Sequence, residues 1–377
     1  MSRRPVVVLE ALSVRSEPTG VAGAAGDLVT ALAANDRGLD FVIVAAAPGA
    51  FAGIAGRPGW RVVAGPAAGG DLRRAWFVQR GLPALCRAVG ADVLHCLQPV
   101  APARPGCGLA VTVHDLAWRV LPQVVRLSRR LYYDAVIPRG WRSADLLLAS
   151  SAATAAGLAG AFPDLASRVR VTPLGTPTWI GRTPIPAPAG IQRPYFLFVG
   201  AREPRKNLPR LLDAYERLLA GSGSQAPGLI LAGPEGWLDG PLRERLARPA
   251  LLGHVDVRGY CEPAELRALY GGALALVFPS LLEGFGLPIL EAMACGVPVL
   301  TSDCGATAEV AGDAALLVDP HDTGAMHLAL ARLADDPRLR ARLAAGGPQR
   351  AQEWTWERTA DLTTGAYREI LRLPRRR

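Results

Sequence analysis

Two glutamates on either side of a glycine-broken loop offer the clearest chemistry in this sequence. Glu283 and Glu291 bracket the segment E-G-F-G-L-P-I-L-E, which follows an apolar run ending at Phe278. Pro288 suits the first turn of a helix, so Glu291 is expected early on a short helix and Glu283 in the loop before it. Glycines let the loop's N–H groups approach a ligand beside a partly positive helix terminus. A diphosphate joined to a hydroxyl-rich sugar would satisfy both the donors and the carboxylates.

A second feature is a single lysine. Of the 42 basic residues only Lys206 is a lysine, and it follows the apolar run Tyr195–Val199 in G-A-R-E-P-R-K-N. A composition so biased toward arginine keeps a lysine where a compact ammonium on a flexible stem is needed, although chance survival is the alternative. Gly200, Arg202 and Lys206 at a strand end, followed by a helix, form the arrangement of a phosphate cradle in an open α/β sheet.

The segment from Glu283 to Glu291 resembles the hallmark of the family 4 glycosyltransferases, E-G-F-G-L-P-x-x-E, without a mismatch. In that family the first Glu contacts the donor sugar, the second contacts the ribose, and the loop amides face the diphosphate. The resemblance gives the amide role to Gly284, Phe285, Gly286 and Leu287. The spacing G-x-R-x-x-x-K-N is similar to the family's pattern too, which implies that Arg202 and Lys206 neutralise the leaving diphosphate. The alternative is that both glutamates are only helix-end charges.

The chain's length and its alternation of elements predict an α/β fold with two domains. A chain of 377 residues, half of them apolar, exceeds what one core usually supports. Short buried strands alternate with amphipathic helices, which favours parallel sheets covered on both faces. We expect strands at 6–10, 41–44, 92–96, 109–113, 146–149, 169–172, 195–199, 229–232, 255–259, 274–278, 299–302 and 316–318. Helices are expected at 23–35, 71–89, 128–143 and 151–161, and from about Leu208.

The domain boundaries follow from composition. Residues 1–178 are expected to form one Rossmann-like domain, 179–194 a Pro-rich linker, and 195–353 a second Rossmann-like domain that binds the nucleotide sugar. This layout looks like the glycosyltransferase fold called GT-B, in which two doubly wound domains face a cleft and the first contacts the acceptor. In that fold a final helix crosses back to the first domain. Residues 354–377 are our candidate for it, and an ordinary helix on its own domain is the alternative.

Three side chains and two further glycines complete the candidate site. His114, in T-V-H-D directly after a buried strand, resembles the family histidine that lines the donor-sugar pocket, although a lone histidine is often structural. Asp115 would orient His114 or bind the acceptor. Gly20 lies in a segment similar to the family's glycine-rich loop near the donor phosphates, with Ala22 where paired glycines are common. The remaining candidates for donor binding follow the second domain's strands: Gly200, Gly233 and Tyr260, of which Tyr260 would stack on the base or merely pack.

Cysteine spacing and hydropathy exclude several classes of protein. The six cysteines show no C-x-x-C spacing, so neither a zinc site nor a disulfide framework is predicted. No apolar run reaches the roughly 18–20 residues that would span a bilayer. Before Glu10 there is an apolar run of only about four residues, short of a signal peptide's core. We therefore expect a cytoplasmic protein.

The formal charge of +9 raises the question of a nucleic-acid partner, but a solvated basic surface is the interpretation that we favour. Arginines are spread through helical patterns without interleaved aromatics, and no nucleic-acid motif appears. Attraction to anionic lipid headgroups, at the inner face of the plasma membrane, is the milder interpretation. Its candidate residues are Arg126, Arg129, Arg130, Arg139, Arg142 and the C-terminal R-R-R.

These observations predict a hexosyltransferase that uses a nucleotide-diphosphate sugar and no cofactor, and the family resemblance implies that it retains the anomeric configuration. No D-x-D-type pair is present, so Arg202, Lys206 and the loop amides would hold the diphosphate without a metal ion. Glu283 and Glu291 are assigned to sugar and ribose, which favours same-face transfer over a covalent intermediate.

The substrates are less well specified by the sequence. The T-V-H-D-L and E-G-F-G-L-P segments resemble bacterial mannosyltransferases, so GDP-mannose is the favoured donor and UDP-glucose the next. The acceptor would be a sugar or a lipid-linked sugar in polysaccharide biosynthesis. The alternatives are a sugar-nucleotide epimerase or hydrolase of the same fold, and a non-catalytic nucleotide-sugar binder. An NAD oxidoreductase is weaker still, because no G-x-G-x-x-G follows the first strand.

Overall fold

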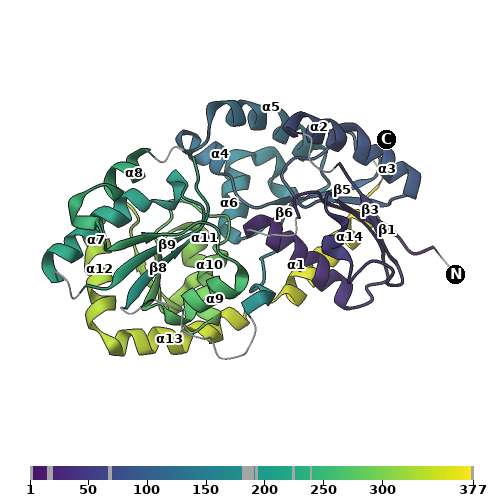
Figure 1. The fold of residues 1–377 in the computed structure, drawn as a ribbon. Coiled ribbons are helices and arrows are strands. Elements are labelled where there is room, and N and C mark those ends of the chain that lie inside the picture. Colours follow the sequence, from purple (N-terminus) through teal and green to yellow (C-terminus); the bar gives the residue numbers. More distant parts are fainter. Residues whose placement is uncertain are drawn as a thin grey trace. The chain divides into compact units, whose positions relative to one another are not determined.

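The chain divides into two compact units (Figure 1). The computed structural model describes residues 3–14, 20–66, 70–180, 191, 194–222, 226–237 and 240–374. Unit 1 comprises Met1–Gly175 and Thr355–Arg377, and unit 2 comprises Thr176–Trp354. Residues 176–178, which we expected in the first domain, therefore group with unit 2. Most of the predicted linker, at 181–190 and 192–193, lies outside the described residues, as does the C-terminal R-R-R.

Unit 1 is built on a seven-stranded parallel sheet in the order β3-β2-β1-β4-β5-β6-β7. The strands are β1 Val6–Ala11, β2 Asp40–Ala45, β3 Trp60–Ala64, β4 Val93–Cys96, β5 Gly108–Val113, β6 Leu146–Ala149 and β7 Val169–Val171. We did not predict β3. It is an edge strand whose residues after Trp60 are only partly buried, so it lacks the continuous apolar run of the central strands.

Helices cover both faces of this sheet. On one face α1 (Gly20–Ala34) packs against α14 (Trp356–Arg372), which also contacts β4, β5 and β6. The other face buries side chains of α3 (Leu82–Val89), α5 (Leu127–Ser143) and α6 (Ala152–Ala161). Since α14 belongs to unit 1, the chain returns to this unit after completing unit 2.

The stretch predicted as one helix at 71–89 is helical throughout, but it is not α-helical throughout. The structure has α2 (Gly70–Trp76), a π-helical turn at Phe77–Gly81, and then α3. Pro83 sits in the first turn of α3 and has no N–H to donate to the preceding turn. A single π turn next to a proline is a common way for a helix to continue past a lost backbone bond. A short helix, α4 (Ala117–Val120), follows β5.

Unit 2 contains a six-stranded parallel sheet in the order β10-β9-β8-β11-β12-β13. Its strands are β8 Tyr195–Val199, β9 Gly228–Ala232, β10 Val255–Val257, β11 Ala275–Phe278, β12 Val299–Ser302 and β13 Leu316–Val318. Its helices are α7 Leu208–Ser222, α8 Gly240–Leu246, α9 Pro263–Gly272, α10 Leu287–Ala294, α11 Gly305–Ala311, α12 Thr323–Asp335 and α13 Pro337–Gln352. The strand predicted at 255–259 ends earlier, at Val257.

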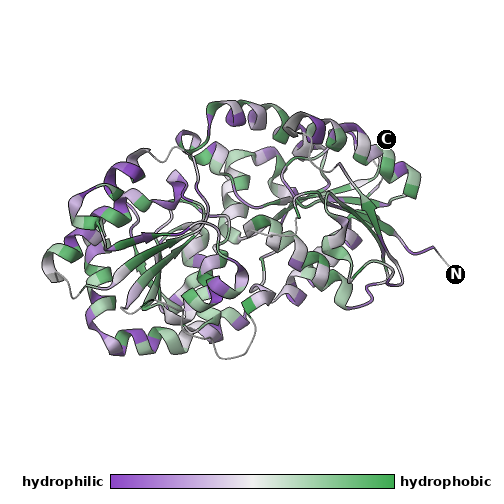
Figure 2. Cartoon of the chain, in the orientation of Figure 1, coloured by the Kyte–Doolittle hydropathy of each residue, from purple (hydrophilic) through white to green (hydrophobic). Residues whose placement is uncertain are grey.

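The strand order decides where polar side chains can meet. In unit 2 the order reverses between β8 and β11, and in unit 1 between β1 and β4. Ligands of open α/β sheets bind beyond the carboxyl ends of strands at such reversals, because the loops there diverge to opposite faces. Figure 2 shows the strands themselves as hydrophobic, and the strands on either side of both reversals are buried. Functional groups must therefore come mainly from the loops after these strands.

Candidate functional site

The loop after β11 is shaped by glycine and anchored by an aromatic ring. Gly286 precedes α10 with φ +114°, a conformation that favours glycine. A Cβ there would lie 3.0 Å from Ile289 Cδ1. Phe285 is only 4% exposed, and its ring packs edge-on against Trp354 at 5.2 Å between centroids. The side chain of Phe285 thus fixes the loop, and only its backbone is left for the ligand contact that we predicted.

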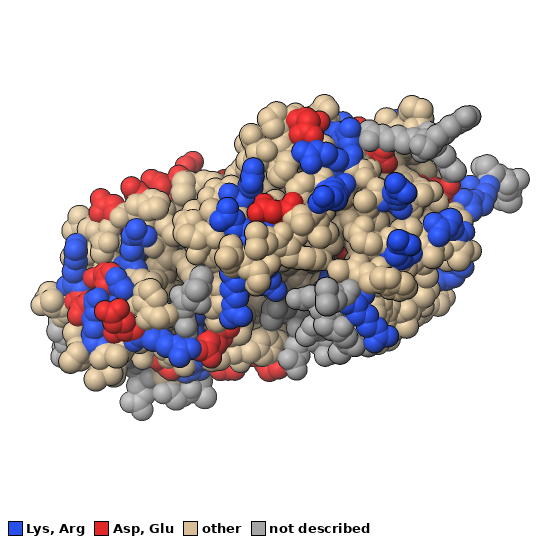
Figure 3. Space-filling model, turned by 90° about the horizontal axis from the view of Figure 1, so that it is seen from above, with Lys and Arg blue, Asp and Glu red and all other residues tan. Residues whose placement is uncertain are grey.

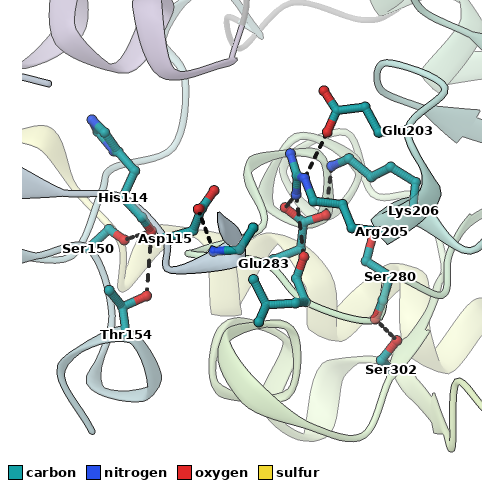
Figure 4. A network of polar contacts seen from close by, with 12 residues as sticks. His114, Asp115, Ser150, Thr154, Glu203, Arg205, Lys206, Ser280, Glu283 and Ser302 are labelled. Carbon is teal, nitrogen blue, oxygen red and sulfur yellow. Dashed lines mark hydrogen bonds and ion pairs between the residues drawn. The ribbon is translucent and has the colours of Figure 1, made fainter. Parts of the chain in front are cut away.

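Two cations converge on Glu283 (Figure 4). The ammonium of Lys206 lies 2.6 Å from Glu283 Oε1, and Arg205 donates to Glu283 Oε2 at 2.7 Å. Arg205 also donates through Nε to Glu203 at 2.8 Å. Lys206 and Glu283 are at the ends of β8 and β11 respectively, so the strand order brings them together although 77 residues separate them.

Burial and neighbouring charges shift the pKa values of both Glu283 and Lys206. Burial would raise the pKa of Glu283, but the charges of Arg205 and Lys206 outweigh it and lower the pKa to about 2. Burial, and then the neighbouring Arg205 charge, lower the pKa of Lys206 against the opposing effect of Glu283. Glu283 is therefore a carboxylate throughout the neutral range. Counting Arg205 and Lys206 against Glu203 and Glu283, the four charges cancel.

Arg202 lies elsewhere. Its guanidinium donates to the carbonyl oxygens of Gly233 and Arg258, at 2.7 and 3.1 Å, and no contact joins it to Glu283 among the interactions of the described residues. Sequence reasoning missed Arg205, the second arginine of A-R-E-P-R-K. The 3-10 turn Pro204–Lys206 places it directly beside the lysine. A sequence cannot show which of two nearby arginines a tight turn aims inward.

Asn207 joins the two loops that carry the cluster. It has φ +62°, a left-handed conformation that asparagine tolerates better than most residues. Its side-chain amide donates to Pro279 O at 3.1 Å, after β11, and to Pro320 O at 2.7 Å, after β13. Asn207 is buried. Its position sets the spacing of the β8 and β11 loops.

Glu291 lies on α10, as predicted, and is 9% exposed. Tyr270 of α9 donates its hydroxyl proton to Glu291 Oε2 at 2.6 Å. Burial, with the nearby Glu291 charge, raises the pKa of Tyr270, so the phenol stays a donor. The contact orients the Glu291 carboxylate.

Glycines bring the ends of β8 and β9 unusually close. Gly233 has φ +140°, and a Cβ on it would lie 2.2 Å from Gly200 O. Gly200 itself has φ +146°, with Lys206 beside it. Tyr260, after β10, is 37% exposed. A pocket of about 390 Å³ nearby is lined by residues that include Arg202, Glu203, Asn207, Asp213 and Arg245; neither Glu283 nor Lys206 lines it.

In unit 1, His114 follows β5 and is held as a neutral imidazole. Burial lowers its pKa, and its Nε2 lies 3.1 Å from Leu97 O. A carbonyl can only accept, so Nε2 carries the proton and Nδ1 is an acceptor. Ser150 and Thr154 donate to the backbone oxygen of His114 (Figure 4). A cavity of about 20 Å³ beside His114 and Thr112 is large enough for one water molecule.

Other predictions for unit 1 have mixed outcomes. Asp115 accepts from the backbone N of Ala117 at 2.9 Å, which closes a turn; the described contacts do not pair its carboxylate with the His114 ring. Gly20 begins α1 with φ +45°, and the residues before it, 15–19, are outside the described ranges. His95, which we did not single out, bonds Tyr367 and Thr112 through its two ring nitrogens, and burial lowers its pKa to about 3. His95 is therefore a structural link between α14 and the sheet.

Within the described ranges, no group of three His, Cys, Asp or Glu side chains could hold a metal ion. The same part of the chain has no helix long and apolar enough to cross a membrane.

Comparison with known proteins agrees with the two-unit fold. The model of the family described as Glycosyl transferases group 1 matches residues 184–350, and the model of Glycosyltransferase Family 4 matches residues 18–179. The chain is 34% identical over 264 residues to O-antigen chain mannosyltransferase B of Escherichia coli, which covers 68% of this chain and 69% of the relative.

Two further matches extend over more of the chain. An MMP alpha-(1->4)-mannosyltransferase of Mycolicibacterium hassiacum is 29% identical over 300 residues, 74% of this chain and 71% of that protein. The solved structure of sucrose-phosphate synthase from Thermosynechococcus elongatus superimposes with a TM-score of 0.74 at 21% identity, over 97% of this chain and 99% of that one. At this identity the likeness shows the fold alone.

Proposed function

The chain belongs to the family 4 glycosyltransferases, retaining enzymes that take a sugar from a nucleotide-sugar donor, and we propose that it transfers mannose from GDP-mannose to an acceptor hydroxyl. The observation that carries the site proposal is the convergence of Arg205 and Lys206 on Glu283 beyond β8 and β11. Two cations and a carboxylate at one strand-order reversal suit a substrate that joins an anionic diphosphate to a hydroxyl-bearing sugar.

Glu283 would accept hydrogen bonds from the sugar hydroxyls, while Arg205 and Lys206 stabilise the leaving diphosphate. The charges of the cluster cancel before the donor binds. The diphosphate oxygens must therefore replace Glu283 as acceptors of some of the hydrogen bonds from Arg205 and Lys206. That exchange leaves fixed positive groups where negative charge develops as the glycosidic bond breaks. In this proposal Arg205 performs the role that the sequence assigned to Arg202.

Glu291 and His114 would fix the rest of the donor. Tyr270 orients the Glu291 carboxylate, which would accept from the ribose hydroxyls. The proton on His114 Nε2 leaves Nδ1 to accept from a sugar hydroxyl. With Glu283 and Glu291 bound to separate parts of the donor, attack on the same face from which the diphosphate leaves is the path we propose.

Metal independence is a further part of the proposal, because Arg205, Lys206 and the amides before α10 supply the counter-charge. Turnover should be unchanged after treatment with EDTA and after addition of magnesium. Activity that disappears with the chelator and returns with the metal would disprove this part and leave the transferase proposal standing.

Mannose is proposed because two relatives that align with about 70% of this chain are named as mannosyltransferases. The test is to incubate the protein with GDP-mannose or UDP-glucose and a panel of sugar and lipid-linked acceptors, and to weigh the products by mass spectrometry. A mannose-extended acceptor is the expected product. Rearranged or hydrolysed donor without an extended acceptor would favour the epimerase or hydrolase instead.

Loss of turnover in Lys206→Ala, with nucleotide binding and folding retained, would separate a catalyst from a binder. A non-catalytic binder would show no turnover in the unaltered protein either. UDP-glucose as the better donor would correct the sugar and the base but not the class of reaction.

We also propose that the acceptor is lipid-linked and that unit 1 contacts an anionic bilayer. Figure 3 shows cationic side chains spread over the displayed face rather than gathered in one patch. On α5, however, Leu127 and Leu131 are 67% and 61% exposed and one helical turn apart, among Arg126, Arg129 and Arg130. Apolar side chains flanked by arginines suit the interface of a bilayer with negative headgroups.

Several of the candidate arginines already have partners within unit 1: Arg142 pairs with Asp164, Arg130 pairs with Asp134, and Arg139 donates to its own helix. Co-sedimentation with phosphatidylcholine vesicles, with and without phosphatidylglycerol, tests the contact. Binding only to the anionic vesicles, lost in Leu131→Glu, is expected. Leu328→Glu on α12, where the leucine is 63% exposed, is the matched control and should bind normally.

A further inference from the structure

Arg202 holds together the ends of three neighbouring strands in unit 2. It follows β8, its backbone N–H donates to Pro234 O at 3.1 Å after β9, and its guanidinium reaches Gly233 O after β9 and Arg258 O after β10. Gly233 N–H in turn donates to Gly259 O at 2.9 Å. One side chain therefore fixes the backbone of the two loops that border Tyr260.

The backbones of these loops are packed closely against the β8 loop that carries Arg202. A Cβ on Gly236 would lie 2.2 Å from Arg202 O, and a Cβ on Gly233 would lie 2.2 Å from Gly200 O. Arg258, whose carbonyl Arg202 binds, is itself held by ion pairs to Asp256 and Glu265. The guanidinium joins both loops through Nη1 alone, which donates to one carbonyl oxygen on each.

We propose that Arg202 is a positioning residue that fixes the backbone edge at Gly233 and Arg258 to Tyr260 for the nucleobase of the donor. This inference rests on the proposed function. A base is recognised by the pattern of its ring donors and acceptors, which requires backbone groups held at fixed positions. Arg202 donates hydrogen bonds to carbonyl oxygens of that edge, whereas Arg205 and Lys206 would bind the diphosphate.

The two possible roles of Arg202 predict different losses of affinity. If Arg202 fixes the base-binding edge, Arg202→Met should weaken guanosine and GDP by the same factor, about tenfold for the loss of hydrogen bonds from a charged group. The ratio of GDP to UDP affinity should fall, and kcat at saturating donor should change little while donor KM rises. If instead Arg202 neutralised the diphosphate, GDP would weaken and guanosine would not.

The test measures binding of guanosine, GDP, uridine and UDP to the full chain by calorimetry, with donor KM and kcat alongside. Arg245→Met is the matched control, because it removes an arginine lining the same pocket that pairs with Asp213 and not with these loops. Arg202→Lys should recover part of the affinity, because a single ammonium can donate to both carbonyls but sits on a shorter side chain. Thermal unfolding of each variant shows whether unit 2 stays folded.

Unchanged guanosine affinity in a folded Arg202→Met protein would overturn the inference, whether or not GDP affinity falls. Failure of the proposed function looks different: the unaltered protein would then show no transfer from any nucleotide sugar. If the protein binds nucleotides but transfers no sugar, the guanosine and GDP affinities of Arg202→Met still test the role of Arg202.

Discussion

The ammonium of Lys206 lies 2.6 Å from a carboxylate oxygen of Glu283 and 4.6 Å from the centre of the Phe278 ring. Lys206 is 6% exposed, so the only lysine of the chain is a buried cation held by one carboxylate and one aromatic face. A buried charge needs such a partner, because it has lost its hydration. Any anion that binds Lys206 must compete with Glu283.

This competition predicts that Glu283→Gln strengthens product binding while it removes turnover. Without the carboxylate, Lys206 and Arg205 are available to GDP, whose affinity should rise about tenfold or more, since a charge pair at this range is worth on the order of 1–4 kcal/mol. Calorimetry with GDP measures the change. Glu369→Gln, which removes a carboxylate paired with Arg170 in unit 1, is the control for net charge. Weaker GDP binding in Glu283→Gln would argue against the exchange.

The alkaline limb of the pH profile should report Lys206. Its pKa is lowered from 10.5 by burial and by Arg205, so its charge is lost at lower pH than that of a free lysine. Because the protonated form stabilises the leaving diphosphate, kcat/KM should fall as pH rises, at a lower pH than the 10.5 expected of a free lysine. Lys206→Arg keeps its charge at that pH and should move the fall to higher pH. An identical alkaline limb in both proteins would assign the fall to another group.

Much of the fold is visible in the sequence because parallel strands buried on both faces read as short apolar runs. The strands at 146–149, 195–199, 299–302 and 316–318 have the predicted bounds, and E-G-F-G-L-P-I-L-E is where the family pattern puts it, in the loop and helix after β11. The edge strand β3 was missed, since half-exposed residues give no such run.

The finer geometry of the site could not be read in this way. Arg202 and Arg205 are the same residue type three positions apart, and only the 3-10 turn decides that Arg205 faces Glu283. The left-handed conformation of Asn207, and its bonds to two distant loops, depend on contacts between strands that a local pattern does not report. Burial of Phe285 depends on Trp354, which is remote in the chain.

Asn207 is expected to contribute to stability in two separable ways. Asn207→Gly keeps the left-handed backbone but loses the bonds to Pro279 O and Pro320 O, at a cost of about 1–3 kcal/mol for buried acceptors left unpaired. Asn207→Ala loses the same bonds and adds about 1 kcal/mol of backbone strain. Urea unfolding followed by tryptophan fluorescence gives the free energy of unfolding of each variant. Equal free energies of unfolding for the alanine and glycine variants would show that backbone strain at residue 207 contributes nothing measurable.

Glu10 should make the protein less stable as pH rises. It is the residue before the last of β1 and is 1% exposed, and its Oε2 has no hydrogen-bond partner among the described residues. Burial raises its pKa from 4.5 to about 7 despite Arg74 nearby. The folded state then binds a proton that the unfolded state has released, so stability falls between about pH 4.5 and pH 7, by about 3 kcal/mol in total, and is level above that range.

Glu10→Gln removes this ionisation. The variant should unfold at a higher temperature than the unaltered protein at about pH 8 and at nearly the same temperature at about pH 5, measured by thermal unfolding of unit 1. Asp36→Asn is a control of opposite sign, because the backbone N–H of Gly38 and then Arg4 lower the pKa of that exposed carboxyl; its loss should destabilise the protein at the higher pH. A Glu10→Gln protein that is less stable at about pH 8 would mean that the Arg74 ion pair outweighs the cost of burial.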